Sequence, residues 1–280
     1  MHKIKILKNL GGISVCKRYF ATQQRLTISK HEDDIYAIEM QNGPVNALNL
    51  EFMRDLVHAI KSLENNADCK AIIFSSFRKA FSAGFFLNEM LDPDTKRLKE
   101  FWKSAQNLAL TIMKTPLITA SAINGSCIAG GCVFSFLSDI TVMNRSDDLR
   151  IGLSATKMGI LPPEMLLMPL INLVGHRKAE MYASQSILLN PADAKESGMV
   201  QYIADGKDVL PLTVNLIKEY IAIPQDGRIA SKKLFTKRIL DELDTKESLN
   251  NEVETFSKSL LSPEVQSMIR SHLEGISRKN

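Results

Sequence analysis

Two short runs of small residues, each following an apolar run, constrain the fold of this chain more than any other feature. The first is Phe81–Phe85 (FSAGF), and the second is Ile123–Cys132 (INGSCIAGGC). Glycine and alanine at such positions let the backbone approach a ligand or another backbone closely. The preceding apolar runs, Ala71–Phe74 and Leu117–Ile123, have the length and composition of strands that are buried on both faces. We therefore expect two loops beside a bound ligand, the second of them opening a helix over Gly131–Leu137.

Strand and helix patterns alternate through the middle of the chain, which is the pattern of βαβ units with parallel strands. The predicted fold class is therefore α/β. From Gly175 onward only helical patterns are found, so the sequence predicts a core over residues 21–200 and a helical region over 201–280. The charged stretch 88–99 is predicted to be a mobile loop before the helix that carries Trp102. The predicted strands are Leu26–Ser29, Ile35–Met40, Ala71–Phe74, Leu117–Ile123, Ile140–Met143 and Arg150–Leu153. The other predicted helices are Leu50–Leu63, His176–Gln185, Pro191–Gly198, 208–221, 228–243 and 249–275.

The N-terminus is basic and contains no acidic residue. Residues 1–20 hold five lysines and arginines with apolar residues between them, which is typical of a mitochondrial transit peptide. Arg18–Thr22 has the composition of a processing site, with cleavage after Phe20; a surface helix that stays on the mature protein is the alternative. The rest of the chain, residues 21–280, contains 30 of the 35 basic residues and all 31 acidic residues. The body is then nearly neutral, and nucleic acid is not expected as its main partner. The sequence predicts a protein of the mitochondrial matrix.

Neither a metal site nor a membrane span is expected. Cys16, Cys69, Cys127 and Cys132 lack the spacing of metal ligands, and we interpret them as small reduced residues of the core. No apolar run reaches the roughly eighteen residues that a helix needs to cross a bilayer. The chain is therefore predicted to work without a metal and outside the bilayer.

Taken together, the two loops resemble those of the crotonase (enoyl-CoA hydratase/isomerase) superfamily, and most closely those of its mitochondrial enoyl-CoA delta isomerases. The similarity extends from Gly43–Leu48 (GPVNAL) to Gly198–Val200 (GMV). It implies a crotonase-like spiral of ββα turns and a helical C-terminal region that makes trimer contacts, so we expect a homotrimer. It also implies an acyl-CoA thioester substrate. CoA would arrive as part of that substrate, and no separate cofactor is expected.

The resemblance implies an oxyanion hole made by the backbone N–H groups of Phe85 and Gly130. Backbone donors suit this role because they are already oriented when charge develops on the thioester oxygen. The Gly130 N–H would lie at a helix N-terminus, where free N–H groups and the helix dipole favour negative charge. The substrate-binding residues that the resemblance implies are Ala83, Gly84, Phe85, Phe86, Leu87, Gly130 and Ser154.

The acids that the superfamily uses are missing from this chain. By resemblance, the delta isomerases carry their catalytic glutamate at the position of Ala155, preceded by asparagine where this chain has Ser154. The hydratases add a second glutamate at the position of Val133. Moving a double bond from the 3,4 to the 2,3 position needs a base that removes a proton from C2 and an acid that adds one at C4. A hydratase mechanism with two carboxylates is therefore not expected, and an isomerase would need a substitute base.

Glu164 is the candidate substitute base. Other branches of the superfamily place their acid a few residues after this segment, and Glu164 lies one position beyond that site in an ungapped count. The alternative is an ordinary acid in the first turn of a helix, which the helix dipole favours. Glu89, on the charged loop, would have to fold inward, and Asp139 is expected to end a helix or to form a structural pair.

Three functions remain open. The first is an active mitochondrial isomerase that shifts 3-enoyl-CoA double bonds in the β-oxidation of unsaturated fatty acids, with Glu164 or another acid as base. The second is a non-catalytic or slow acyl-CoA-binding paralogue, and the third is another crotonase reaction such as thioester hydrolysis. The length of the similarity favours the first, which is our prediction, whereas Ala155 favours the second.

Overall fold

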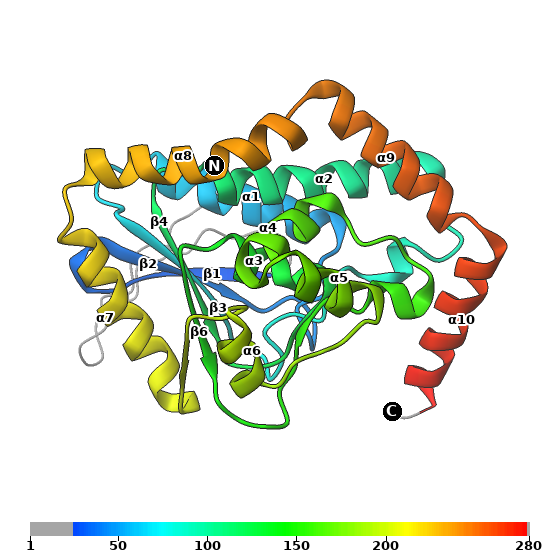
Figure 1. The fold of residues 1–280 in the computed structure, drawn as a ribbon, viewed down its shortest axis with the longest axis horizontal. Helices are drawn as coiled ribbons and strands as arrows, with labels where there is room; N and C mark the ends of the chain where they lie inside the picture. Colours follow the sequence, from blue (N-terminus) through cyan, green and yellow to red (C-terminus); the bar gives the residue numbers. More distant parts are fainter. Residues whose placement is uncertain (1–24, 279–280) are drawn as a thin grey trace, which may run out of the picture.

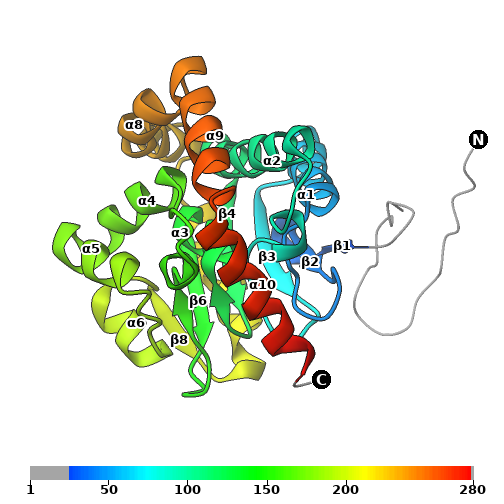
Figure 2. The same ribbon diagram turned by 90° about the vertical axis from the view of Figure 1, so that its right-hand side faces the viewer.

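A six-stranded sheet forms the centre of the protein (Figures 1 and 2). The structure is a computed structural model and describes residues 25–278. The strands are β1 (Leu26–Lys30), β2 (Ile35–Met40), β3 (Ala71–Ser76), β4 (Ile118–Ile123), β5 (Cys127–Ile128), β6 (Ile140–Asn144), β7 (Ile151–Gly152) and β8 (Tyr202–Ala204). The sheet order is β1-β2-β3-β4-β6-β8, and every neighbouring pair is parallel except the antiparallel β1 and β2. β5 and β7 form a separate small sheet. The predicted α/β class is confirmed.

Helices cover both faces of the sheet. They are α1 (Leu50–Glu64), α2 (Thr95–Lys114), α3 (Cys132–Leu137), α4 (Glu164–Val174), α5 (His176–Ser184), α6 (Pro191–Ser197), α7 (Val209–Ile221), α8 (Gln225–Leu243), α9 (Lys246–Leu260) and α10 (Pro263–Ser277). Successive side chains of a strand point to opposite faces. In β3, Ile72 and Phe74 therefore join the large core with α1, α2 and α3, whereas Ala71 and Ile73 join the smaller core under α7. This explains the unbroken apolar run that the sequence shows there.

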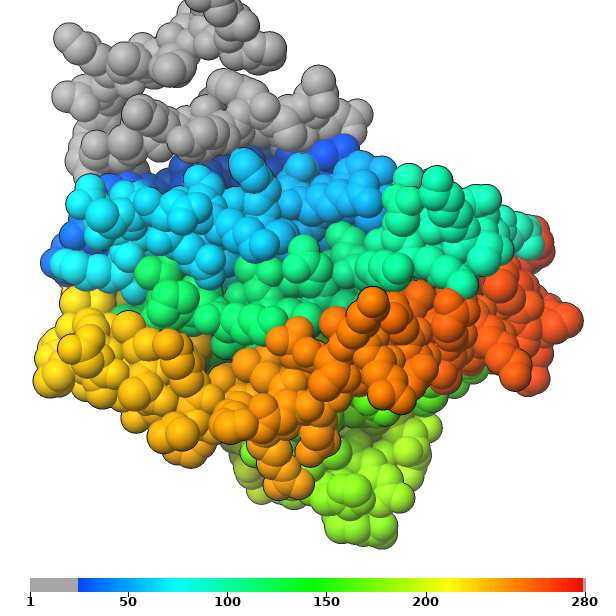
Figure 3. Space-filling view, turned by 90° about the horizontal axis from the view of Figure 1, so that it is seen from above, coloured from blue at the N-terminus to red at the C-terminus, as the bar shows by residue number. Residues whose placement is uncertain are grey.

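The last three helices pack mainly on other helices. Figure 3 shows α9, in orange, alongside α2, and the two helices are in contact. On α8, the Lys232 ammonium lies 2.7 Å from the Asp139 carboxylate, which also accepts a hydrogen bond from the Thr119 N–H at 2.8 Å. Burial lowers the pKa of Lys232, and the charge of Asp139 opposes this shift. The pair fastens α8 to the sheet, so the structural pairing predicted for Asp139 is confirmed.

Two predictions about the C-terminal half are wrong. β8 adds a strand to the sheet beside β6, although only helices were expected after Gly175. It escapes the sequence pattern because it is three residues long and begins with the exposed Tyr202. The helix expected over 249–275 is two helices, α9 and α10. Ser262 caps α10 by accepting a hydrogen bond from the Val265 N–H at 3.3 Å, and Pro263, which lacks an N–H, starts the new helix.

The stretch 88–99 is a loop only in its middle. A 3₁₀ turn, η2 (Leu87–Glu89), precedes it, and α2 already begins at Thr95. The Asp94 side chain caps α2 by accepting a hydrogen bond from the Arg97 N–H at 2.8 Å. Three of the charged residues that suggested a loop, Lys96, Arg97 and Lys99, thus belong to the start of a helix.

Two other predictions concern a transit peptide at the N-terminus and the absence of a membrane-spanning helix. The proposed transit peptide, residues 1–20, lies outside the described residues. Within residues 25–278, no helix combines the length and the apolar character needed to cross a membrane.

Candidate functional site

The first small-residue loop lies beside the chain around Leu48. The Leu48 N–H donates to the Gly84 carbonyl oxygen at 2.7 Å, and the Phe86 N–H donates to the Leu48 carbonyl oxygen at 3.0 Å. In this parallel bridge, neighbouring N–H groups point to opposite sides. The N–H of Phe85 therefore points away from Leu48. Gly84 has a φ of 89°, a conformation that glycine adopts without steric cost.

The second small-residue loop touches the first. It forms a 3₁₀ turn, η3 (Ala129–Gly131), which continues directly into α3. Gly130 lies in the first turn, where a backbone N–H has no partner inside the helix. A methyl group added at Gly84 would lie 2.7 Å from the Ile128 carbonyl oxygen and 2.9 Å from the Gly130 nitrogen. The structure thus brings together the two backbone groups, at Phe85 and Gly130, that were predicted to form the oxyanion hole.

The side chain of Phe85 forms an aromatic wall beside Gly130. A methyl group at Gly130 would lie 2.7 Å from the Phe85 ring. The ring centroid of Phe85 is 5.7 Å from that of Phe101 and 5.4 Å from that of Trp102. The loop is therefore packed against α2, which carries both of these aromatic residues.

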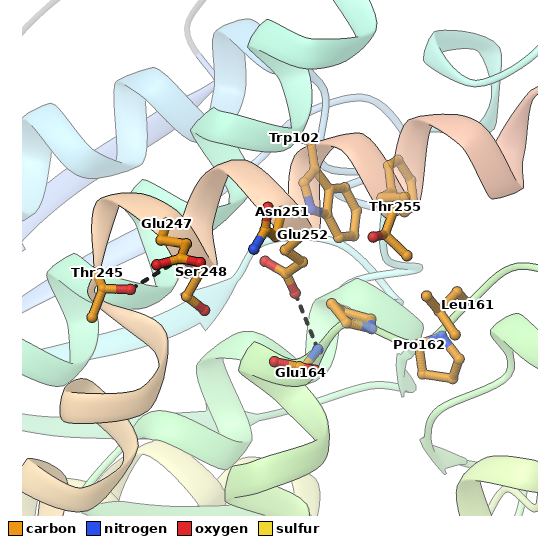
Figure 4. A pocket seen from close by; sticks show the side chains of 12 residues that line it. Trp102, Leu161, Pro162, Glu164, Thr245, Glu247, Ser248, Asn251, Glu252 and Thr255 are labelled. Carbon is orange, nitrogen blue, oxygen red and sulfur yellow. Dashed lines mark hydrogen bonds between the residues drawn. The ribbon is translucent and has the colours of Figure 1, made fainter.

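A cavity of about 400 Å³ lies between α2, the start of α4 and α9 (Figure 4). Its volume is within the range of small-molecule pockets. Trp102 belongs to its wall and stacks on Phe256 of α9, with ring centroids 3.4 Å apart and an angle of 10° between the planes. Because Trp102 also contacts Phe85, one ring joins the cavity to the two loops. The lining residues are Trp102, Leu161, Pro162, Pro163, Glu164, Thr245, Glu247, Ser248, Asn251, Glu252, Thr255 and Phe256.

Two glutamates meet in this cavity across the gap between α4 and α9. Glu164 is the exposed first residue of α4, and its backbone N–H donates to Oε1 of Glu252 at 3.1 Å. Glu252 is half-buried, and its Oε2 accepts a hydrogen bond from Nε2 of Gln106 at 2.7 Å. Burial raises the pKa of Glu252 and the charge of Glu164 adds to this shift, whereas the hydrogen bonds from Gln106 and from the Glu164 backbone oppose it.

The sequence analysis did not identify Glu252. The sequence did carry a sign that Glu252 lies near the buried face of its helix. It precedes the buried Val253 and stands one turn before the buried Phe256 on an amphipathic helix. Its neighbours Gln106 and Glu164 lie 146 and 88 residues away in the chain. The pattern of α9 alone does not show which helices its buried face meets.

Ala155 and Ser154 lie apart from the lining of this cavity. Ala155 begins a 3₁₀ turn, η4 (Ala155–Met158), and packs half-buried against the large core. The next residue, Thr156, donates its hydroxyl to the Ala183 carbonyl oxygen at 2.8 Å. The position at which the resemblance places the family's glutamate is therefore held by a methyl group. Val133, the second such position, is 3% exposed within α3.

The other predicted substrate-binding residues follow the first loop to the surface. Ala83 is exposed, and its N–H donates to the Val45 carbonyl oxygen at 2.9 Å. Phe86 is 39% exposed, and the half-buried Leu87 packs against the edge of the large core. Their contacts with a substrate stay a prediction.

Glu89 is folded inward, but it has a structural partner. Its carboxylate accepts two hydrogen bonds from the Arg97 guanidinium, each at 2.7 Å. It also accepts one from the Leu50 N–H at 3.4 Å, at the start of α1. Glu89 thus ties α1 to α2. Within residues 25–278, no group of three or more His, Cys, Asp or Glu side chains is placed to hold a metal ion.

The architecture defines the class of this protein as a crotonase-like α/β fold. A solved structure of human mitochondrial delta3-delta2-enoyl-CoA isomerase matches it with a TM-score of 0.88 and 30% sequence identity, covering 92% of this chain and 100% of that chain. An enoyl-CoA hydratase from Bacillus halodurans matches with a TM-score of 0.78 over 88% of this chain and 99% of that chain. At 24% identity, the second match shows the fold alone.

The sequence comparisons then give the family. The Enoyl-CoA hydratase/isomerase family model matches residues 30–277, so the chain belongs to this family of enzymes. Enoyl-CoA delta isomerase 1, mitochondrial, of Homo sapiens is 31% identical over 258 residues, which are 92% of this chain and 85% of the human protein. The Rattus norvegicus protein of the same name is 29% identical over 96% of this chain and 92% of its own length. The resemblance predicted from the two loops is confirmed.

Proposed function

We propose that this protein is a mitochondrial enoyl-CoA isomerase that converts 3-enoyl-CoA to trans-2-enoyl-CoA in the β-oxidation of unsaturated fatty acids. The observation that carries the proposal is the contact between the two loops that hold the N–H groups of Phe85 and Gly130, beside an aromatic wall shared with a cavity. Similarity to the human mitochondrial isomerase over 92% of this chain supports the reaction.

The proposed reaction develops negative charge on the thioester oxygen. When a proton leaves C2, the electron pair of that C–H bond moves into the dienolate, whose oxygen accepts hydrogen bonds from Phe85 and Gly130. Protonation at C4 then leaves the double bond between C2 and C3. Removing a single donor of this kind costs about 10²–10³ in kcat in well-studied enzymes. Two oriented backbone donors therefore supply a large part of the catalysis.

The acyl chain is proposed to extend from the loops past Trp102 into the cavity. Trp102, Phe256 and Leu161 give that cavity apolar walls, which suit a hydrocarbon chain. The family resemblance places adenine and pantetheine near the backbone of Ala83 and Gly84. The exposure of Ala83 leaves its surroundings open to solvent and to a ligand.

The base is the open part of the mechanism, and Glu164 stays the prediction made from sequence. Its carboxyl group belongs to the cavity lining and starts α4. If Glu164 is the base, Glu164→Gln lowers turnover by about 10²–10⁴ and leaves acyl-CoA affinity unchanged. Glu180→Gln is the matched control, because Glu180 is an exposed acid of α5 whose only described ion pair is with Arg177. Unchanged turnover of Glu164→Gln in an active protein would exclude Glu164 as the base.

An acyl-CoA-binding protein with little or no turnover is the alternative function. The observation that favours it is Ala155, whose methyl group occupies the position of the family's catalytic glutamate. Such a protein would keep the oxyanion hole and the cavity, because neither depends on that residue.

The same proposal includes a homotrimer in the mitochondrial matrix. On α8, Leu234 is 72% exposed and Phe235 is 84% exposed in the single chain, and adjacent apolar side chains of this size are suited to a contact with another copy. Light scattering by the purified protein measures its assembly, and import into isolated mitochondria measures its destination.

The deciding experiment is turnover of a 3-enoyl-CoA by the purified full-length protein, measured as formation of the conjugated product, together with calorimetric binding of a saturated acyl-CoA. Turnover well above the uncatalysed rate supports the isomerase. Tight binding without turnover supports the receptor, and the absence of both overturns the proposed use of the site.

A further inference from the structure

Resting on the isomerase function proposed above, we propose that Glu252 of α9 is the catalytic carboxyl that removes a proton from C2 and delivers a proton to C4. The family's glutamate comes from the segment after β7, whereas Glu252 comes from a helix near the C-terminus. Glu252 would thus replace the family's glutamate as the base, although it lies in a different part of the chain.

The first argument is the position of Glu252. Figure 4 shows its side chain projecting from α9 into the cavity, between Trp102 and the start of α4. Phe256, one turn later on the same face of α9, stacks on Trp102 at 3.4 Å. Trp102 in turn lies against Phe85, with ring centroids 5.4 Å apart. An acyl chain that leaves the oxyanion hole along this wall passes the carboxyl group of Glu252.

The second argument is orientation. Each carboxylate oxygen of Glu252 is held by one hydrogen bond, Oε2 by Gln106 at 2.7 Å and Oε1 by the Glu164 N–H at 3.1 Å. A carboxylate oxygen has two lone-pair sites, so these bonds fix the group and leave acceptor capacity on both oxygens. Gln106 is itself fixed, because its Nε2 also donates to the Leu249 carbonyl oxygen at 3.0 Å. A base that serves both C2 and C4 needs such a rigid carboxylate.

The third argument is the surroundings of the group. Glu164 from α4 and Glu247 from α9 are the other titratable residues of the cavity lining, while α2 faces Glu252 with the neutral Gln106 and Trp102. Neither lysine nor arginine occurs in the described lining. Burial raises the pKa of Glu252 above its ordinary value. A general base works best when its pKa lies near the working pH, so this shift increases its strength.

Glu164 has a different role in this arrangement. Its side chain is exposed, and its contact with Glu252 is made by its backbone N–H. Glu164 therefore positions Glu252. In the reaction, the C2–H bond breaks and its proton passes to Glu252. The electron pair enters the dienolate that Phe85 and Gly130 hold. Glu252 then gives a proton to C4, or back to C2, and in D₂O that proton exchanges with solvent before it is given up.

The test compares Glu252→Gln with Glu254→Gln, a control on the same helix whose carboxylate pairs with Lys99 at 2.6 Å outside the cavity lining. Two rates are measured with 3-enoyl-CoA in D₂O: deuterium uptake at C2, by mass spectrometry, and formation of the conjugated product. We expect Glu252→Gln to lower both by about 10²–10⁴, with acyl-CoA affinity retained, and Glu254→Gln to lower neither. If the rate of deuterium uptake in Glu252→Gln stayed within about tenfold of the wild-type rate, the proposal would be overturned.

A second variant separates catalysis from a loss of structure. Gln106→Met removes a hydrogen bond that lowers the pKa of Glu252, so it should raise that pKa further. Because the ionised form is the base, activity is lost as pH falls through this pKa. The acidic limb of the kcat/KM profile should therefore move to higher pH. A Glu252 that only fastens α9 to α4 would leave this limb in place while the melting temperature falls, and that result would also overturn the proposal.

The two measured rates also keep this proposal distinct from the isomerase proposal. Deuterium uptake at C2 that depends on Glu252, without conjugated product, would refute the isomerase and support the base. Acyl-CoA binding with neither rate above background would refute the base and support the receptor.

Discussion

The two halves of the site are built in different ways. The half predicted to hold the oxyanion consists of two loops that meet at Gly84 and Gly130, and its proposed donors are the backbone N–H groups of Phe85 and Gly130. The cavity half consists of side chains from α2, from α9 and from the start of α4, and Glu252 and Trp102 are among them. A backbone donor survives a change of side chain, whereas a side-chain acid is lost with one substitution. This difference would allow the loops to persist in a chain that has Ala155 at the position predicted for the family's acid.

The difference also appears in how each half is stabilised. In the oxyanion half, main-chain hydrogen bonds such as Leu48 to Gly84 fix the loops locally. In the cavity half, Glu252 is fixed only when Gln106 and Glu164 arrive from two other helices. We therefore expect substitutions in the loops to act through backbone geometry and those in the cavity to act through charge and packing.

Among the substitutions outside the cavity lining, Gly130→Ala should have the largest effect. The added methyl group would lie 2.7 Å from the Phe85 ring, so either the ring or the loop must move. Displacing one oxyanion donor costs about 10²–10³ in kcat, and we expect a loss of this size in steady-state turnover of 3-enoyl-CoA. Gly227→Ala on α8 is the control, because nothing lies within 4 Å of its added methyl group. If Gly130→Ala kept wild-type turnover, Gly130 would not be a donor.

Ala155→Glu tests whether the cavity half already contains a base. It restores the family's acid, and the half-buried site lies at the edge of the core. If Glu252 already acts as base, a second carboxylate should raise turnover by less than about tenfold, whereas an uncompensated site should gain about 10²–10⁴. Ala155→Gln has the same volume without the charge and serves as the control. A gain of the larger size would refute a substitute base.

The smallest effect on activity, but a clear one on stability, is expected for Lys232→Met. The Lys232 and Asp139 side chains are 9% and 19% exposed, so the variant leaves a largely buried carboxylate without its counter-charge. Removing one partner of a buried pair costs about 3 kcal/mol, which urea unfolding can measure. Lys233→Met is the control, because Lys233 is exposed, and it should change the free energy of unfolding by no more than about 0.5 kcal/mol. Equal stability of the two variants would mean that the pair does not fasten α8.

The same pair predicts a pH dependence. Burial lowers the folded-state pKa of Lys232 below its ordinary value of 10.5, so between the two values the unfolded chain binds more protons. The free energy of unfolding should then rise with pH across this interval. This rise should be absent in Lys232→Met.

The sequence by itself determined what depends on near neighbours in the chain. Ala71–Phe74 predicted a doubly buried strand, and the small residues around Gly84 and Gly130 predicted loops whose backbones meet a ligand. Both the strand and the contact between the loops are present. Periodicity and glycine chemistry are local properties, so a single sequence displays them. Periodicity was sufficient to predict the α/β class, and the resemblance of the two loops to those of the crotonase superfamily supplied the family.

Only the tertiary structure decided which side chains share the cavity. β8 lacks a recognisable pattern because it is short and half-exposed, and the break at Pro263 separates α9 from α10. Once α9 packs beside α2, Phe256 stacks on Trp102 and Glu252 meets Gln106 and the start of α4. Long-range packing of this kind depends on the shapes and charges of whole helices. The local pattern of α9 is compatible with many partners, and the folded chain selects one.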